Sequence, residues 1–206
     1  MKKTILRFQA FVLPLLLMGL AGCILETQGY DLLINGRLLL GEICLGCFVA
    51  CVLLEAIMLL VITVRTKKLI LILLNVVVIP CVLALLFLFG GFVFLRAIIF
   101  GGSEIYHFEE FDKDIVVYNQ SLLLAGQSNI YETSDGILVR YVAMADGDDG
   151  YMPLQIEDAF SMTPSPDGLL IEYHFCGPND SKDYDYNLYL KYEDGYFVKD
   201  YQNWMK

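Results

Sequence analysis

Two long apolar runs constrain this chain more than any other feature of its sequence. Residues 38–64 and 69–95 span 27 residues each, and charged or helix-breaking residues are rare in both. A helix of this length reaches about 40 Å, which exceeds the ~30 Å hydrocarbon core of a bilayer. Neither run has the polar face of a soluble surface helix. We therefore predict that both runs are transmembrane helices.

The link between these runs sets the predicted topology. Residues 65–68, Arg-Thr-Lys-Lys, carry three positive charges, and cytoplasmic loops are enriched in such charges. A link this short joins the helices as a hairpin, so we place it in the cytoplasm and the residues after Leu95 outside. Lys2, Lys3 and Arg7 place the N-terminus inside as well, whereas Arg96 opposes the bias.

Charge divides the chain after Gly102. The first 102 residues carry eight basic and four acidic side chains, whereas the remainder carries six basic and 20 acidic ones, together with 12 of the 13 tyrosines. This contrast indicates a membrane part joined to an acidic, water-soluble part. It excludes a wholly soluble protein and a nucleic-acid binder that relies on bulk positive charge.

The acidic part shows the period-two alternation that is typical of β-strands. Apolar and polar residues alternate from Ile137 to Ala145, and Leu188 and Leu190 share one face of the segment 184–192 with three tyrosines. Asp194-Gly195 then predicts a hairpin turn, and other Gly- and Asp-rich turns separate the remaining runs. Strands at this spacing favour an antiparallel meander or sandwich.

The predicted fold class is a membrane α-helical hairpin, with two or three transmembrane helices, followed by an all-β or mainly-β extracytoplasmic domain. The predicted parts are a signal peptide or first transmembrane helix at 1–25, transmembrane helices at 38–64 and 69–95, a cytoplasmic loop at 65–68, a linker at 101–112 and the β domain at 113–206.

The first apolar run differs from the other two. Residues 10–25 are short for a span and typical of a signal peptide. Leu20-Ala21-Gly22-Cys23 resembles the lipobox of bacterial lipoproteins. The resemblance covers residues 1–23 and implies a bacterial cytoplasmic membrane, cleavage before Cys23 and a diacylglycerol on its sulfur. Most lipoproteins lack further spans, and the alternative is an uncleaved first helix from Phe8 to Leu25.

A weaker resemblance concerns the outer domain. The segments 121–126, 130–131, 148–151 and 165–168 look like parts of small bacterial membrane proteins with outer β domains. No activity attaches to that family, so the resemblance implies only the architecture.

Glu55 is the strongest site candidate in the membrane part, because an ionisable residue in the hydrocarbon region is expensive and is often functional. Folding the hairpin about its loop brings Asn75 near Glu55. We expect a protonated Glu55 that hydrogen-bonds Asn75 as an intramembrane polar pair with a structural role. Ion translocation would need further polar groups along a path, and Glu42 lies near the outer end, where it can reach the headgroups.

Three cysteines share a helical stripe with Glu55. Cys44, Cys47 and Cys51 lie three and four residues apart on one face. A thiolate–carboxylate metal site is one interpretation, and a face of small residues that packs against a neighbouring helix is the other.

Few patterns in the outer domain point to chemistry. Asp146, Asp148 and Asp149 are a weak calcium candidate, since the stretch lacks the twelve-residue loop and closing Glu of an EF-hand. His174 and Cys176 lie about 7 Å apart on a strand, which is too far for an activated thiolate. The sequence contains no Gly-x-Ser-x-Gly, His-Glu-x-x-His or phosphate-loop motif. We therefore expect neither an enzyme nor a cofactor.

Two functions follow from these patterns. The first is a membrane-anchored surface binding or accessory module without catalysis, whose partner is an envelope protein, a peptide or a glycan. The second is an immunity or modulator protein that acts on another membrane protein through its helical hairpin. The lipid bilayer is a partner in both cases, no nucleic acid is expected, and the oligomeric state stays open.

Overall fold

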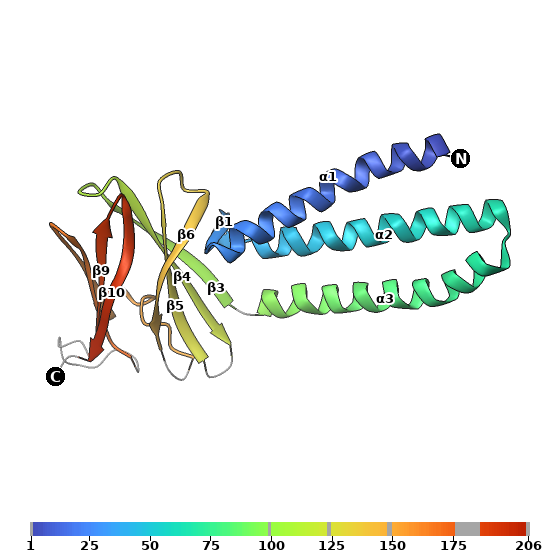
Figure 1. Ribbon diagram of the computed structural model, residues 1–206. Helices are drawn as coiled ribbons and strands as arrows, with labels where there is room; N and C mark the ends of the chain where they lie inside the picture. The colour runs from blue at the N-terminus through green and yellow to red at the C-terminus, as the bar shows by residue number, and fades with distance from the viewer. Residues whose placement is uncertain (1, 99, 123–124, 148–149, 176–185, 205–206) are drawn as a thin grey trace. The chain divides into compact units, whose positions relative to one another are not determined.

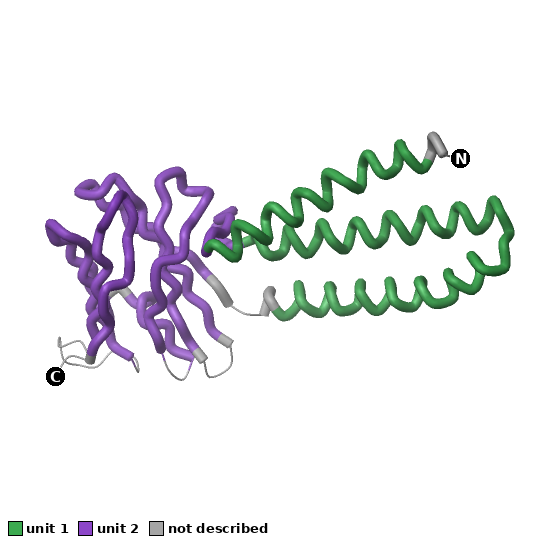
Figure 2. The backbone as a smooth tube through the Cα atoms, in the orientation of Figure 1, with its two compact units in different colours: residues 1–28, 39–97 green, residues 29–38, 98–206 purple. Residues whose placement is uncertain are grey.

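Two compact units make up the protein, and Figure 2 distinguishes them. The helical unit comprises residues 1–28 and 39–97, and the β unit comprises residues 29–38 and 98–206. The computed structural model in Figure 1 describes residues 2–98, 100–122, 125–147, 150–175 and 186–204.

The helical unit contains α1 (Lys2–Thr27), α2 (Leu40–Thr66) and α3 (Leu69–Ile98). All three helices are long and apolar enough to cross a membrane. The two predicted runs are therefore helical, and the first apolar run is a third helix of comparable length. Lys67 caps the C-terminus of α2 with a left-handed φ of 51°, and its N–H donates to Thr63 O at 2.8 Å.

Helices α1 and α2 pack closely through small residues. A Cβ atom at Gly22 would overlap Cys44 Sγ, and one at Gly19 would lie 3.3 Å from Cys47 Cβ. Cys51 Sγ lies 3.7 Å from Val12 O. The cysteine stripe of α2 is thus buried against α1, because glycines let the two backbones approach. Figure 1 shows the two helices side by side.

The β unit consists of two antiparallel sheets. The first has six strands in the order β2-β1-β6-β5-β4-β3, and the second has four in the order β10-β9-β8-β7. The strands are β1 (Tyr30–Ile34), β2 (Arg37–Leu38), β3 (Phe100–Phe108), β4 (Lys113–Leu122), β5 (Ala125–Thr133), β6 (Leu138–Asp146), β7 (Phe160–Ser165), β8 (Gly168–Tyr173), β9 (Tyr186–Glu193) and β10 (Tyr196–Trp204).

A core of apolar side chains fills the space between the two sheets. Ile115, Ile130, Ile171, Leu188 and Leu190 belong to it and are fully buried. This arrangement confirms an antiparallel, mainly-β fold, and the alternation read from residues 184–192 correctly identifies the two leucines as core. The predicted hairpin is also confirmed, since Glu193 pairs with Tyr196 across Asp194-Gly195.

The six-stranded sheet curls into a half-barrel. Strands β2 and β3 lie at opposite ends of the strand order, yet a Cβ atom at Gly36 in the β1–β2 turn would come within 3.2 Å of Ser103 Oγ. The concave face encloses a second, smaller cluster of buried residues, namely Leu33, Leu38, Val116, Tyr118 and Val139.

Two segments correct the predicted boundaries. Residues 101–112, expected to be a linker, lie largely in β3, which pairs with β4 along its whole length. Residues 29–38, which join α1 to α2, form the β1–β2 hairpin and extend the same sheet through β6. Asn35 and Gly36 make this hairpin possible, because their φ values of 51° and 75° are those of a tight hairpin turn.

Candidate functional site

An open cleft of about 720 Å³ lies between the edges of the two sheets. One wall is the segment Glu104–Phe108 of β3, and the other is Phe160–Met162 of β7, with Gln155 beside them. Strands β3 and β7 each lie at one end of their sheet among the described strands. The cleft is therefore bordered by two strand edges, where backbone groups are available to a ligand.

The floor of the cleft is aromatic. The rings of Tyr106 and Phe160 meet edge to face, with centroids 6.0 Å apart. Phe160 belongs to the sandwich core, and Tyr106 and Met162 pack against that core. The floor is thus fixed by the same contacts that hold the sheets together. Ile105, by contrast, points outward and is 54% exposed.

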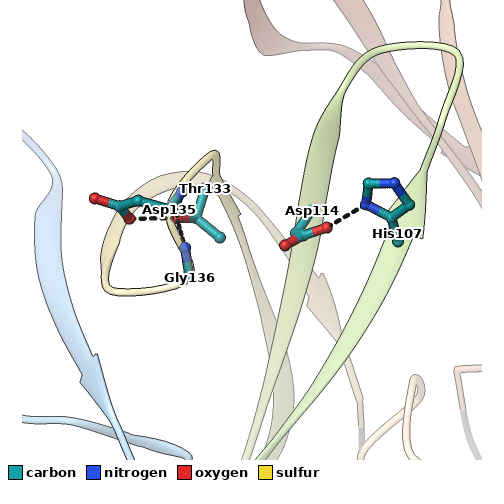
Figure 3. Close-up of polar contacts among 5 residues, drawn as sticks. All are labelled: His107, Asp114, Thr133, Asp135 and Gly136. Carbon is teal, nitrogen blue, oxygen red and sulfur yellow. Dashed lines mark hydrogen bonds and ion pairs between the residues drawn. The ribbon is translucent and has the colours of Figure 1, made fainter.

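The rim of the cleft is acidic. Tyr106 Oη donates a hydrogen bond to Glu104 Oε2 at 2.5 Å. His107 Nδ1 lies 2.6 Å from Asp114 Oδ1, as Figure 3 shows. The hydrogen bond to Asp114 raises the pKa of His107, and the negative charges of Asp114, Glu109 and Asp112 add to the effect. His107 therefore lies in a negative field.

The β3–β4 turn holds these acidic residues in place. Phe111 N–H donates to Phe108 O at 3.2 Å, and Asp112 takes a left-handed φ of 50°. The Phe111 ring is buried in the core, 5.0 Å from the ring of Phe197. Because Phe111 anchors the turn, the carboxylates beside it project from a well-defined position.

An ion pair within the first sheet is hydrogen-bonded to β10 of the second sheet, near a smaller pocket of about 270 Å³. Glu132 is 2% exposed and accepts a hydrogen bond from Arg140 Nε at 2.6 Å. Phe197 of β10 completes the network, since its N–H donates to Glu132 Oε2 and its carbonyl accepts from Arg140 Nη2. All these groups are engaged with each other, so we assign the network a structural role.

The turn before β6 is likewise structural. Asp135 Oδ1 accepts hydrogen bonds from the N–H groups of Ile137 and Leu138, both at 2.9 Å. It also accepts one from Thr133 Oγ1 at 3.0 Å, as Figure 3 shows. The bond from Ile137 is the largest cause that lowers the pKa of Asp135. The carboxylate stabilises the turn and is not aimed at the cleft.

In the helical unit, the structure replaces the expected Glu55–Asn75 pair by two others. Gln9 Nε2 of α1 donates to Glu55 Oε1 at 2.7 Å. Asn75 Nδ2 donates to Thr63 Oγ1 at 2.6 Å, nearer the loop. The reason is the third helix, since α1 packs along α2 and carries Gln9 to Glu55. The prediction from sequence rests on the hairpin of α2 and α3 alone.

Glu55 lines a groove of about 560 Å³ in the helical unit. The walls of this groove are mostly apolar and include Val12 and Leu16 of α1, Val52 of α2 and Val78 of α3. Glu55 itself is exposed on the surface of this unit. A carboxylate in an apolar groove is unusual, because ionisable residues in membrane helices generally face polar partners.

The structure describes the other predicted site residues only in part. Cys23 is half-buried within α1. Asp146 is the last residue of β6 and is exposed, while Asp148, Asp149 and Cys176 lie outside the described residues. Among the residues that the structure describes, no three His, Cys, Asp or Glu side chains gather as a metal site.

Comparison with known proteins gives no match: no protein-family model, no curated protein and no solved structure is similar to this chain. The site is therefore interpreted from its own geometry. Sequence reasoning missed the cleft because its walls are about 55 residues apart in the chain. One signal was present, since Tyr106 and Phe108 alternate with polar residues in the segment read as a linker.

Proposed function

We propose that this protein is a membrane-anchored binding module. In this proposal its three apolar helices hold the β unit at the outer face of a cell membrane, and the cleft between β3 and β7 receives the partner. The observation that carries the proposal is the cleft itself, with two strand edges, an aromatic floor and an acidic rim. Open pockets with a few placed polar groups are the usual ligand sites of proteins.

The pairing of β1 with β6 supports the proposed topology. Tyr30 pairs with Arg140, so residues 29–38 and the C-terminal strands form one sheet. A single sheet lies on one side of a membrane, and the two crossings by α2 and α3 between these segments bring both to the same side. The positive charges of residues 65–68 favour the opposite, cytoplasmic side for the α2–α3 loop.

The packing of α1 favours a retained helix over a cleaved signal peptide. The segment that would be removed, residues 1–22, carries Gln9, Gly19 and Gly22, which meet Glu55 and the cysteine stripe of α2. Removing it would take away the hydrogen bond from Gln9 to Glu55 and uncover three cysteine side chains of α2. We therefore propose that α1 is a third transmembrane helix.

Photo-crosslinking in native membranes tests the binding function. A benzoyl-phenylalanine replaces Ile105 at the cleft in the full chain, and the matched control replaces Val198 of β10, which is 47% exposed. We expect a discrete adduct from position 105 and none from position 198. The same adducts at both positions, or none at either, would contradict a partner site in the cleft.

The groove around Glu55 favours a second candidate, a modulator that binds another membrane protein through its helices. A partner helix with a polar or basic side chain would give Glu55 a second polar contact beside Gln9, because a carboxylate that faces lipid is costly. A crosslinker at Val52, which lines this groove, separates the candidates. Adducts from position 52 with none from position 105 would favour the modulator.

A further inference from the structure

We propose that the occupant of the cleft is an extended, basic peptide segment of a partner protein, which adds a strand to the outer edge of β3. The inference rests on the proposed binding function and names the class of its ligand. Three observations carry it: the regularity of the β3 edge, the apolar floor beside it and the charge around it.

The edge of β3 is suited to pairing with another chain. Its nine residues pair with β4 in continuous register without a bulge, and none of them is proline. Glu104–Phe108 therefore presents a regular row of backbone groups to the cleft. An extended peptide can hydrogen-bond to such an edge and place alternate side chains in flanking pockets. The opposite wall, β7, contains Pro164 and is the poorer template.

The floor beside this edge can receive apolar side chains. An added strand would run along Tyr106 and face Phe160 and Met162 across the cleft. Methionine adapts to different neighbours, and the two aromatic rings are held by the core. Glu104–Phe108 would pair with about five residues of peptide, roughly 17 Å of extended chain.

Charge complementarity selects a basic peptide. Glu104 lies in the cleft, and Glu109, Glu110 and Asp112 follow in the adjoining turn. Two basic residues lie nearby, and both are engaged. His107 is paired with Asp114, and Lys113, the first residue of β4, is directed toward the ring of Tyr196, with 5.2 Å between its Nζ and the ring centroid. Lysine or arginine side chains of a bound strand would therefore meet carboxylates, whereas an acidic peptide would be repelled.

The test uses the full chain in nanodiscs of zwitterionic lipid and a fluorescein-labelled peptide of alternating lysine and valine, seven residues long. One matched peptide carries N-methyl groups on alternate residues, which removes strand hydrogen bonds, and another has glutamate for lysine. We expect saturable binding of the first peptide by anisotropy, binding at least about tenfold weaker after N-methylation, and none with glutamate.

Two protein variants locate the site. Glu104→Lys should weaken binding of the lysine–valine peptide by about tenfold or more, because it reverses the charge in the cleft. Asp146→Asn removes an exposed carboxylate from the end of β6, three strands away from β3, and should leave binding unchanged. Equal binding of the N-methylated peptide would overturn strand addition, and an unchanged affinity of Glu104→Lys would overturn the location.

The outcome also separates this inference from the proposed function. If the lysine–valine peptide fails to bind while position 105 still crosslinks a partner in membranes, the binding function stands and the peptide class is wrong. If the crosslinker at position 105 captures a glycan or glycolipid, the binding function likewise stands and the peptide class is wrong. If neither the peptide nor the crosslinker detects a partner, both proposals fail.

Discussion

At the scale of single residues, the ion pair between Glu132 and Arg140 ties β10 to the first sheet. Glu132→Ala would leave Arg140 without its counter-ion and the N–H of Phe197 without its acceptor. We expect a loss of about 3–5 kcal/mol in the free energy of unfolding, because breaking a buried pair leaves an uncompensated charge. Urea unfolding of the full chain, followed by the fluorescence of Trp204, measures it.

The matched control is Glu193→Ala. Glu193 contacts Lys191, and both side chains are about half exposed. Exposed ion pairs contribute little to stability, so this variant should unfold at nearly the same urea concentration as the parent chain. Equal destabilisation by the two variants would mean that the Glu132 network does not join the sheets.

His107 gives a pH-dependent prediction at the same scale. Its pKa is raised above the usual value of 6.5, first by the hydrogen bond to Asp114. The stabilisation from charged His107 is thus fully present below pH 6.5 and is lost as the pH rises through the folded-state pKa. Asp114→Asn should lower the pKa of His107, measured by NMR titration of this imidazole in the parent chain and in the variant. An unchanged His107 titration would refute the contact.

At the scale of elements, the β1–β2 hairpin is part of the β unit. Leu33 is 6% exposed, whereas its neighbour Ile34 is 41% exposed. Leu33→Asp should lower the melting temperature of the β unit by several degrees or more, because it buries a charge among Val116 and Val139. Ile34→Asp, in the same strand, should have little effect. Thermal unfolding of each full-length variant is followed by Trp204 fluorescence. Similar melting temperatures of the Leu33→Asp and Ile34→Asp variants would contradict the placement of the hairpin in the β unit.

Helix α1 gives a prediction about processing. If α1 is retained, the chain and its Cys23→Ala variant should both have the intact mass of all 206 residues, differing only by the substitution, and neither should incorporate labelled palmitate. A shorter parent chain that carries palmitate, together with a longer Cys23→Ala chain, would instead establish the lipoprotein interpretation and remove α1 from the mature protein.

Local patterns explain which elements could be predicted from the sequence. The helices follow from apolar length, and Leu188 and Leu190 follow from period-two alternation, since both signals lie within one segment. The pairing of Tyr30 with Arg140 joins residues 110 positions apart, which no local pattern encodes. Asn35-Gly36, between α1 and α2, is nevertheless a sequence typical of a tight β-hairpin turn.

The candidate site was harder to predict for the same reason. The cleft arises where the edges of two sheets approach, so its existence depends on the strand order and not on any motif. Gly101, Gly102 and Glu104 gave the first half of β3 the composition of a linker. The partner of Glu55 was missed because Gln9 belongs to the first apolar run, which the sequence allows to be either a removable signal peptide or a helix.

At the scale of the whole molecule, the proposed topology places the β module, assembled from residues 29–38 and the C-terminal strands, on the outer side of a membrane, anchored by three helices. The chain order requires the α2–α3 loop on the other side. Each of these segments offers a position where a cysteine can be labelled without disturbing the core.

Cysteine labelling in sealed cells tests this claim most directly. Single cysteines replace Ile34, Thr66 or Ser134 in a chain whose six native cysteines are alanine, and a membrane-impermeant maleimide is added before or after permeabilisation. We expect positions 34 and 134 to be labelled in sealed cells and position 66 only after permeabilisation. Labelling of positions 34 and 134 from opposite sides, or of position 66 in sealed cells, would contradict the account.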